Sequence, residues 1–231
     1  METRYRIQTE AGCDDEEMTS LLQNGYYLYS VSAFEYFNRA HEKIAASKTH
    51  RHYLFYAALE TRFLIETILR EYLVTLKDFG SSRAASDHYR PTSVIKEIEA
   101  AEPYFADKVH FANVLLQASE VANQLPIPDL QLFRSYYEAL HKYLHTQHLP
   151  TYLVESDWWQ HFEEELAGML EFARPFLQMP KVRLTCNDSG LKLFHRFRRG
   201  ELSAESLLEI ARNNLFNDAE IELRFRQFPQ E

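Results

Sequence analysis

Amphipathic segments separated by short polar breaks fill most of the chain. Within each segment, apolar side chains recur three or four residues apart, which is the period of an α-helix. The segments cover residues 16–46, 51–76, 92–102, 103–123, 130–148 and 157–179. Residues 80–91 (GSSRAASDHYRP) are small and polar and indicate a loop. The pattern predicts a mainly α protein, with an up-and-down helical bundle over residues 16–178.

The segment 51–76 has the widest apolar arc of the predicted helices. An arc that covers more than one face is typical of a central helix with several neighbours. Its apolar members are Leu54, Ala58, Phe63, Ile65, Leu69, Tyr72 and Leu76. Two later helices have capping residues in front of them, Asp129 and Ser156, and Pro175 predicts a kink near the end of the last one.

The period of the pattern changes beyond residue 180. The segments KVRLTC (181–186) and EIELRFR (220–226) alternate apolar and charged residues, as half-buried strands do. NDSG (187–190) is typical of a turn, and residues 203–216 form a capped amphipathic helix. We therefore expect residues 181–231 to be a small C-terminal α+β appendage, and the polar residues 1–15 to be flexible.

Composition supports the helical prediction and limits the function classes. The chain has 231 residues with only 6 Gly and 8 Pro, which leaves little material for tight turns. A net charge of −9 argues against extended non-specific nucleic-acid binding, in which phosphate contacts dominate the affinity. Cys13 and Cys186 lie far apart and predict a reducing compartment without a disulfide framework. With no apolar leader and no run of about 18 apolar residues, a cytoplasmic protein outside the membrane is expected.

The helix predicted at residues 130–148 carries a narrow polar strip between two apolar stripes. At about 100° per residue, the strip members fall within about 40° of one line; they are Arg134, Glu138, His141, His145 and His148. One stripe contains Phe133, Tyr137, Leu140 and Leu144, and the other contains Leu132, Tyr136, Ala139 and Tyr143. Because a single bundle core does not easily cover both stripes, we expect the strip to border a cleft or a two-fold dimer interface.

The chemistry of the strip fits phosphodiester cleavage. Arg134 and His141 are two helical turns apart, so they face the same way about 10 Å apart along the axis. Arginine offers a permanently charged fork for a phosphate, and histidine transfers a proton near neutral pH. These two groups supply half of a general acid–base site, which a second copy of the chain would complete.

The run RSYYEALH (Arg134–His141) resembles the R-x4-6-H motif of HEPN domains. The helical body around it, including AALETRFLIETIL (57–69), also looks like HEPN, and the resemblance covers residues 16–178. It implies a HEPN-like helical bundle that dimerises, so that two motifs form one metal-independent endoribonuclease site without a cofactor. Many catalytic members carry Asn, Asp or His directly after the arginine, where this chain has Ser135.

The resemblance also implies a biological setting. Members of this superfamily often serve in phage defence and toxin–antitoxin systems, so RNA is the expected substrate and a cognate antitoxin or defence partner is expected. Arg134 and His141 are then the catalytic residues, and Glu138 and His145 are candidate supporting residues on the same strip.

Two other interpretations of the strip remain open. Arg134 and Glu138 have the i,i+4 spacing of an ordinary surface ion pair, so the strip can be a solvated face of a non-catalytic module that binds a partner protein or a nucleotide. Alternatively, His141 and His145 have the spacing of two zinc ligands, with Glu138 one turn away. The sequence shows no HExxH order and no obvious further ligand, so no metal is expected.

Further candidates carry weaker signals. Lys192, Arg196, Arg198 and Arg199 form the most basic patch, and the interleaved Phe194 and Phe197 would suit RNA contact, although a solvated amphipathic segment is the commoner case. The cluster His50–Arg51–His52 is expected to be exposed. Glu66 is expected to pair with Arg70, and Trp158 and Trp159 to lie in a core or an interface. No motif of nucleotide-driven or acyl-transfer chemistry occurs.

Overall fold

The computed structural model describes residues 7–9, 32–78, 91–118, 125–145, 157–177, 181–214 and 219–225. These residues are mainly helical, as the sequence pattern predicts. They form two compact units, which we call the helical unit (30–103 and 129–178) and the mixed unit (1–29, 104–128 and 179–231). The helix predicted to begin at residue 16 and the loop predicted at 80–91 fall largely outside the described residues.

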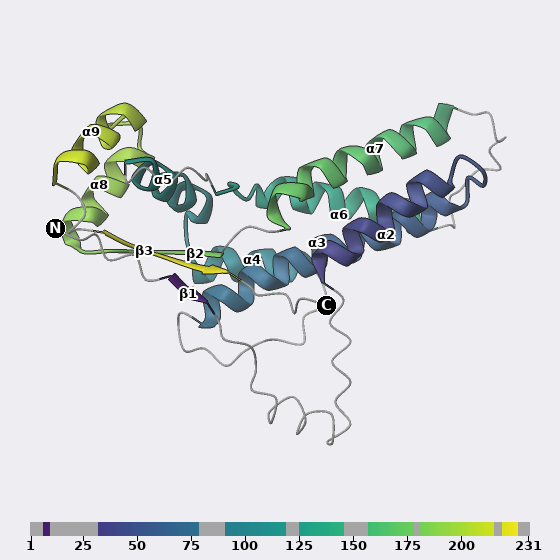
Figure 1. The fold of residues 1–231 in the computed structure, drawn as a ribbon, viewed down its shortest axis with the longest axis horizontal. Coiled ribbons are helices and arrows are strands. Elements are labelled where there is room, and N and C mark those ends of the chain that lie inside the picture. Colours follow the sequence, from purple (N-terminus) through teal and green to yellow (C-terminus); the bar gives the residue numbers. More distant parts are fainter. Residues whose placement is uncertain are drawn as a thin grey trace, which may run out of the picture. The chain divides into compact units, whose positions relative to one another are not determined.

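The helical unit is built around one long helix, α3 (Tyr53–Asp78), which packs against four others. These are α2 (Ala33–Ala46), α4 (Pro91–Ala101), α6 (Leu130–Leu144) and α7 (Asp157–Ala173), the last followed by the 3-10 turn η2 (Arg174–Phe176) (Figure 1). The buried residues of α3 are Leu54, Ala57, Ala58, Thr61, Leu64, Ile65, Ile68, Leu69, Tyr72 and Leu73. The central position predicted for this helix is confirmed. Its Phe63, expected to be buried, is instead exposed.

Local chemistry fixes the ends of these helices. Ser32 accepts a hydrogen bond from the Glu35 amide, and the Glu35 carboxylate accepts one from the Ser32 amide, which is a complete capping box at the start of α2. The predicted cap of α6 is confirmed, because Asp129 accepts a 2.8 Å hydrogen bond from the Leu132 amide. The α6 helix ends at Leu144, since His145 already has an extended backbone, and His148 lies outside the described residues.

In its described residues, the mixed unit combines three helices with a three-stranded sheet. The helices are α5 (Phe105–Ala118), α8 (Asp188–Arg198) and α9 (Ala204–Asn214), and the strands are β1 (Ile7–Thr9), β2 (Lys181–Cys186) and β3 (Ala219–Phe225). The strand order is β1-β3-β2. Strand β2 is antiparallel to β3, with Val182 opposite Leu223, and β1 is parallel to β3. Sequence analysis missed β1, which lies in the stretch predicted to be flexible.

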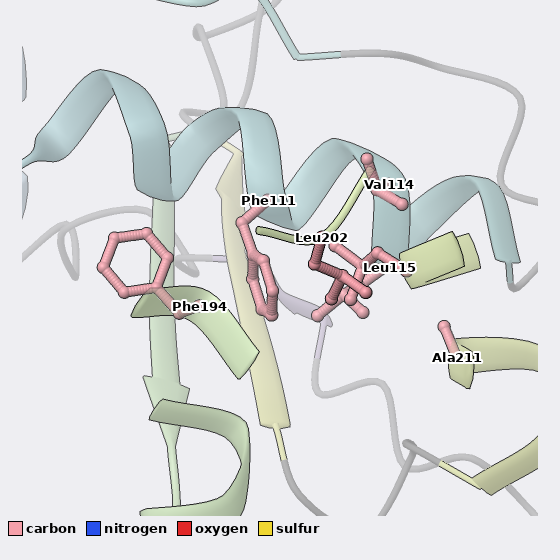
Figure 2. Packing of buried hydrophobic residues seen from close by; sticks show 7 residues of the cluster. Phe111, Val114, Leu115, Phe194, Leu202 and Ala211 are labelled. Atoms are coloured by element: carbon pink, nitrogen blue, oxygen red, sulfur yellow. The ribbon is translucent and has the colours of Figure 1, made fainter. Parts of the chain in front are cut away.

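The domain boundary predicted from the sequence is wrong, because α5 belongs to the mixed unit. Every residue from Phe111 to Leu116 on α5 is buried, so this helix needs cover on all sides. Its Phe111 contacts Phe194 of α8 with ring centres 5.7 Å apart, and Leu202, Leu207 and Ala211 complete the cluster (Figure 2). The sheet therefore does not belong to a separate C-terminal appendage, since residues 104–128 share its unit.

The turn predicted at NDSG is also wrong. Asn187 is the N-cap of α8, and its side chain accepts hydrogen bonds of 3.0 Å from the amides of Ser189 and Gly190. Asparagine in front of small polar residues suits both a turn and a helix start, because in each case its side-chain oxygen accepts from a nearby amide. The basic run that follows is consequently helical.

Candidate functional site

The polar strip of α6 lies at the boundary between core and solvent. Phe133 and Leu140 are the buried residues of α6, while Glu138, His141 and His145 are exposed. Arg134 is half-buried, and its Nε atom is buried without a hydrogen-bond partner. The periodicity therefore predicted which face of α6 carries the polar strip. Within the strip, Arg134 is less exposed than His141 and His145.

Both apolar stripes of α6 are covered within the helical unit. On one stripe Phe133 lies 4.8 Å from Phe172 of α7, measured between ring centres; on the other, Tyr136 lies 5.3 Å from the same ring. Tyr143 stacks on Phe162 of α7 at 4.0 Å, and its hydroxyl donates a hydrogen bond to Glu165. The argument that two stripes require a second copy of the chain is therefore wrong.

A cation that sequence analysis assigned no functional role faces α6 from the central helix. Arg62 of α3 donates a 2.9 Å hydrogen bond to the Tyr137 hydroxyl, and its guanidinium carbon lies 5.1 Å from the centre of that ring. The Arg62 Nε atom also donates to Glu66 at 2.9 Å. Arg62 is thus held between α3 and α6 by a carboxylate and a phenol.

Glu66 has a partner that the sequence analysis did not name. The sequence offers Glu66 two i±4 partners, Arg62 and Arg70, and the structure shows the Arg62 ion pair. The signal that could have singled out Arg62 is its place as the one cation in the mostly apolar stretch AALETRFLI (57–65) of the central helix, where a cation needs polar partners.

His141 has a perturbed environment although it is exposed. Its ring centre lies 3.9 Å from that of His145. Partial desolvation, the neighbouring His145 and the positive charge of Arg62 lower the pKa of His141 below its ordinary value. The neutral imidazole, which can accept a proton, is therefore favoured near neutral pH.

These residues form one cluster, which we call the seam cluster: Arg62 and Glu66 on α3, Tyr137 and His141 on α6, and His145 at the C-cap of α6. It combines a fixed guanidinium, a phenol and two imidazoles beside solvent. A guanidinium can bind a phosphate and an unprotonated imidazole can accept a proton, so the cluster has the groups that phosphodiester chemistry uses. Ser135, which follows Arg134, instead donates its hydroxyl to the Gln131 carbonyl at 3.0 Å.

The basic residues at 192–199 belong to the mixed unit, whereas the seam cluster belongs to the helical unit. Lys192, Arg196 and Arg199 are exposed, whereas the guanidinium of Arg198 lies 3.8 Å over the ring of Tyr104. Phe194 is buried and Phe197 packs against the same core cluster. Both rings are used in packing, and RNA contact by Lys192, Arg196, Arg198 and Arg199 stays a prediction.

Comparisons with known proteins add no family to this description. No family model matches the chain, and neither curated proteins nor solved structures give a significant match. Within the described ranges, no three His, Cys, Asp or Glu side chains come together as a metal site would require. Over the same ranges, the helices lack the combination of length and apolar character that crossing a bilayer demands.

Proposed function

We propose that the chain is a metal-independent endoribonuclease of the HEPN type, acting through the polar strip of α6. The observation that carries the proposal is the seam cluster, in which Tyr137 holds the Arg62 guanidinium between α3 and α6. Partial desolvation, His145 and, least of the three, Arg62 lower the pKa of His141 there. The resemblance of Arg134–His141 to the R-x4-6-H motif supports the same assignment. It also suggests a role in phage defence or in a toxin–antitoxin system, with an antitoxin or defence partner.

In the proposed reaction, the ribose 2′-oxygen attacks the adjacent phosphorus. His141 accepts the proton of the 2′-hydroxyl, the new bond from the 2′-oxygen to phosphorus forms, and the bond to the 5′-oxygen breaks. A second histidine donates a proton to the departing 5′-oxygen, which leaves a 2′,3′-cyclic phosphate. Arg62 and Arg134 are the cations available to hold the phosphate and stabilise its developing charge.

The geometry of the two histidines supports a homodimer as the active form. A base and an acid for an in-line displacement act on opposite sides of the phosphorus. The rings of His141 and His145 are only 3.9 Å apart, so both approach a bound phosphate from the same side. We therefore assign the proton donor to the strip of a second copy, and His145 to a supporting role.

The experiment is cleavage of labelled RNA in EDTA, with analysis of the product ends. A 2′,3′-cyclic phosphate is expected, and a substrate with one 2′-deoxynucleotide should resist cleavage at that position. Intact RNA at all protein concentrations, or cleavage that requires an added metal ion, would overturn the proposal.

The alternative is a non-catalytic helical module that binds a partner protein or a nucleotide. It is favoured by the ion pair of Arg62 with Glu66, which already satisfies part of that guanidinium, and by the half-buried position of Arg134. Under this alternative, His141→Ala changes neither the fold nor any RNA-cleaving activity.

A further inference from the structure

Four rings form a continuous cluster where α3 begins, and we call them the ring cluster: His50, His52, Tyr53 and Tyr56. The ring centres of His50 and His52 are 5.6 Å apart, and His52 stacks on Tyr53 at 4.6 Å. Tyr56 lies 6.2 Å from His52 and 6.0 Å from Tyr53. These distances are those of rings in contact.

The ring cluster lies at the surface, whereas its aromatic neighbour packs inward. Tyr56 is 53% exposed, and His50 and His52 are exposed. Phe55 instead lies 5.7 Å from Trp159 and 5.6 Å from Phe162 of α7. Tyr56 is therefore not needed to fill the core, and about half of its surface is accessible to a ligand.

Residues 43–59, which include the ring cluster, carry a positive charge, although the whole chain has a net charge of −9. From residue 43 to residue 59 the sequence contains Lys43, Lys48 and Arg51 and no acidic residue. Lys43 lies over the Tyr53 ring at 5.7 Å. Lys48 and Arg51 share one carboxylate, that of Glu163, so together they still carry an excess positive charge.

The ring cluster continues along α3 toward the seam cluster. His52 precedes the helix, and Tyr56, Leu59 and Phe63 follow it at spacings of three or four residues, which places them on one exposed line. Leu59 and Phe63 are each 37% exposed, and Arg62 of the seam cluster neighbours them on the same helix. From residue 52 to residue 62 the rise is about 15 Å, comparable to about four stacked nucleotides at roughly 3.4 Å each.

From these observations we infer that the ring cluster is a base-stacking subsite for single-stranded RNA, which leads the strand along α3 to the seam cluster. Stacking on an aromatic face accepts any base, and Lys43 supplies charge for the phosphates. The inference rests on the proposed function, since it concerns the same RNA, but it can be tested without cleavage.

The test measures binding of a fluorescein-labelled 2′-O-methyl oligouridylate of eight nucleotides by anisotropy. Its 2′-oxygen carries no proton and cannot attack, so the probe reports affinity alone. Tyr56→Ala should raise the Kd by about 5- to 160-fold, as expected for losing one stacked base, and Tyr56→Phe should retain the affinity. Lys43→Ala should reduce the slope of log K against log salt by about 0.7.

Phe34→Ala is the matched control. Phe34 is a 42% exposed aromatic residue on α2, and it lies two residues from Tyr36, which contacts Phe63 at 5.5 Å. Two residues correspond to about 200° around the helix, so Phe34 faces away from the exposed line. Its replacement should leave the Kd unchanged, and circular dichroism should show the same melting temperature for all variants.

Each outcome of the test is decisive for the inference. A wild-type protein that does not bind the probe, or a Tyr56→Ala variant with the wild-type Kd, overturns it, even if RNA cleavage is observed. If Tyr56→Ala instead abolishes self-association in sedimentation while the Kd stays the same, the face contacts a second copy and the inference is wrong. If the probe binds through Tyr56 but no RNA is cleaved, the subsite stands and the proposed function fails.

Discussion

The Arg62 guanidinium of α3 donates a 2.9 Å hydrogen bond to the Tyr137 hydroxyl of α6 and lies over the same ring. This contact connects residues 75 positions apart in the sequence. It brings a cation from the central helix beside the histidines of the R-x6-H strip. Because Arg62 also pairs with Glu66, its position is fixed from both helices.

Tyr137→Phe tests this contact. The change removes the phenol oxygen and keeps the ring, so the free energy of unfolding should fall by about 1 kcal/mol, the usual net value of a hydrogen bond. The rate of RNA cleavage should fall too, because Arg62 loses its partner on α6. Urea denaturation of Tyr137→Phe beside Tyr136→Phe provides the comparison. Equal stability and activity of the two variants would show that the hydrogen bond contributes nothing.

Asn113→Ala is expected to be the most damaging polar substitution in the mixed unit. The buried Asn113 amide donates to the Leu125 carbonyl and accepts from the Leu125 amide, both at 2.8 Å, which ties the segment after α5 to that helix. Truncation leaves two backbone groups without partners, at a cost of about 1–3 kcal/mol each. Chemical denaturation should show a loss of at least about 2 kcal/mol, whereas exposed Ser135→Ala should change stability by less than about 0.5 kcal/mol.

The pH dependence of His141 follows from its environment. Its pKa is lowered in the folded state, so the unfolded chain binds more protons between the two pKa values and folding stability falls as the pH drops through that window. His145→Ala removes one of the neighbouring charges and should move the pKa of His141 back up toward its ordinary value. NMR titration of the His141 ring in both proteins measures the shift. A pKa that stays the same or falls further would contradict the electrostatic account.

The zinc interpretation and the metal-independent one predict different results for His145. If His141 and His145 were two metal ligands, His145→Ala and His141→Ala would reduce activity equally, and EDTA would abolish it. We expect His145→Ala to retain much more activity than His141→Ala, with wild-type activity unchanged by EDTA. Initial cleavage rates of the three proteins with and without EDTA decide the question.

Sequence reasoning predicted the features that are determined within a single helix. The direction of the α6 strip and the central role of α3 follow from spacings of three or four residues, which the helical geometry fixes locally. The Asp129 cap follows from the residue type in front of the helix. The place of His141 on the polar strip, beside the apolar stripes, is of this kind. Local patterning was sufficient there because one face of the helix has to be buried.

What sequence reasoning missed depends on contacts between distant segments. The contact of Arg62 with Tyr137, and the cover that α7 gives to both stripes of α6, depend on which helices meet. The same holds for α5, whose apolar surface fits either unit until α8 and α9 are seen to cover it. Asn187 shows a different limit of sequence reasoning. The sequence NDSG suits both a turn and a helix start, and the structure shows the helix start.

The central claim is that Arg134 and His141 act in RNA cleavage, and the most direct measurement compares Arg134→Ala and His141→Ala with the wild type on labelled RNA in EDTA. Loss of a proton-transfer group costs about 10²–10⁴-fold in rate, and a similar loss is predicted for the arginine. Both variants should keep the wild-type circular dichroism spectrum, since His141 is exposed and neither side chain is fully buried. Cleavage by both variants at the wild-type rate, or no cleavage by the wild type, would contradict the account.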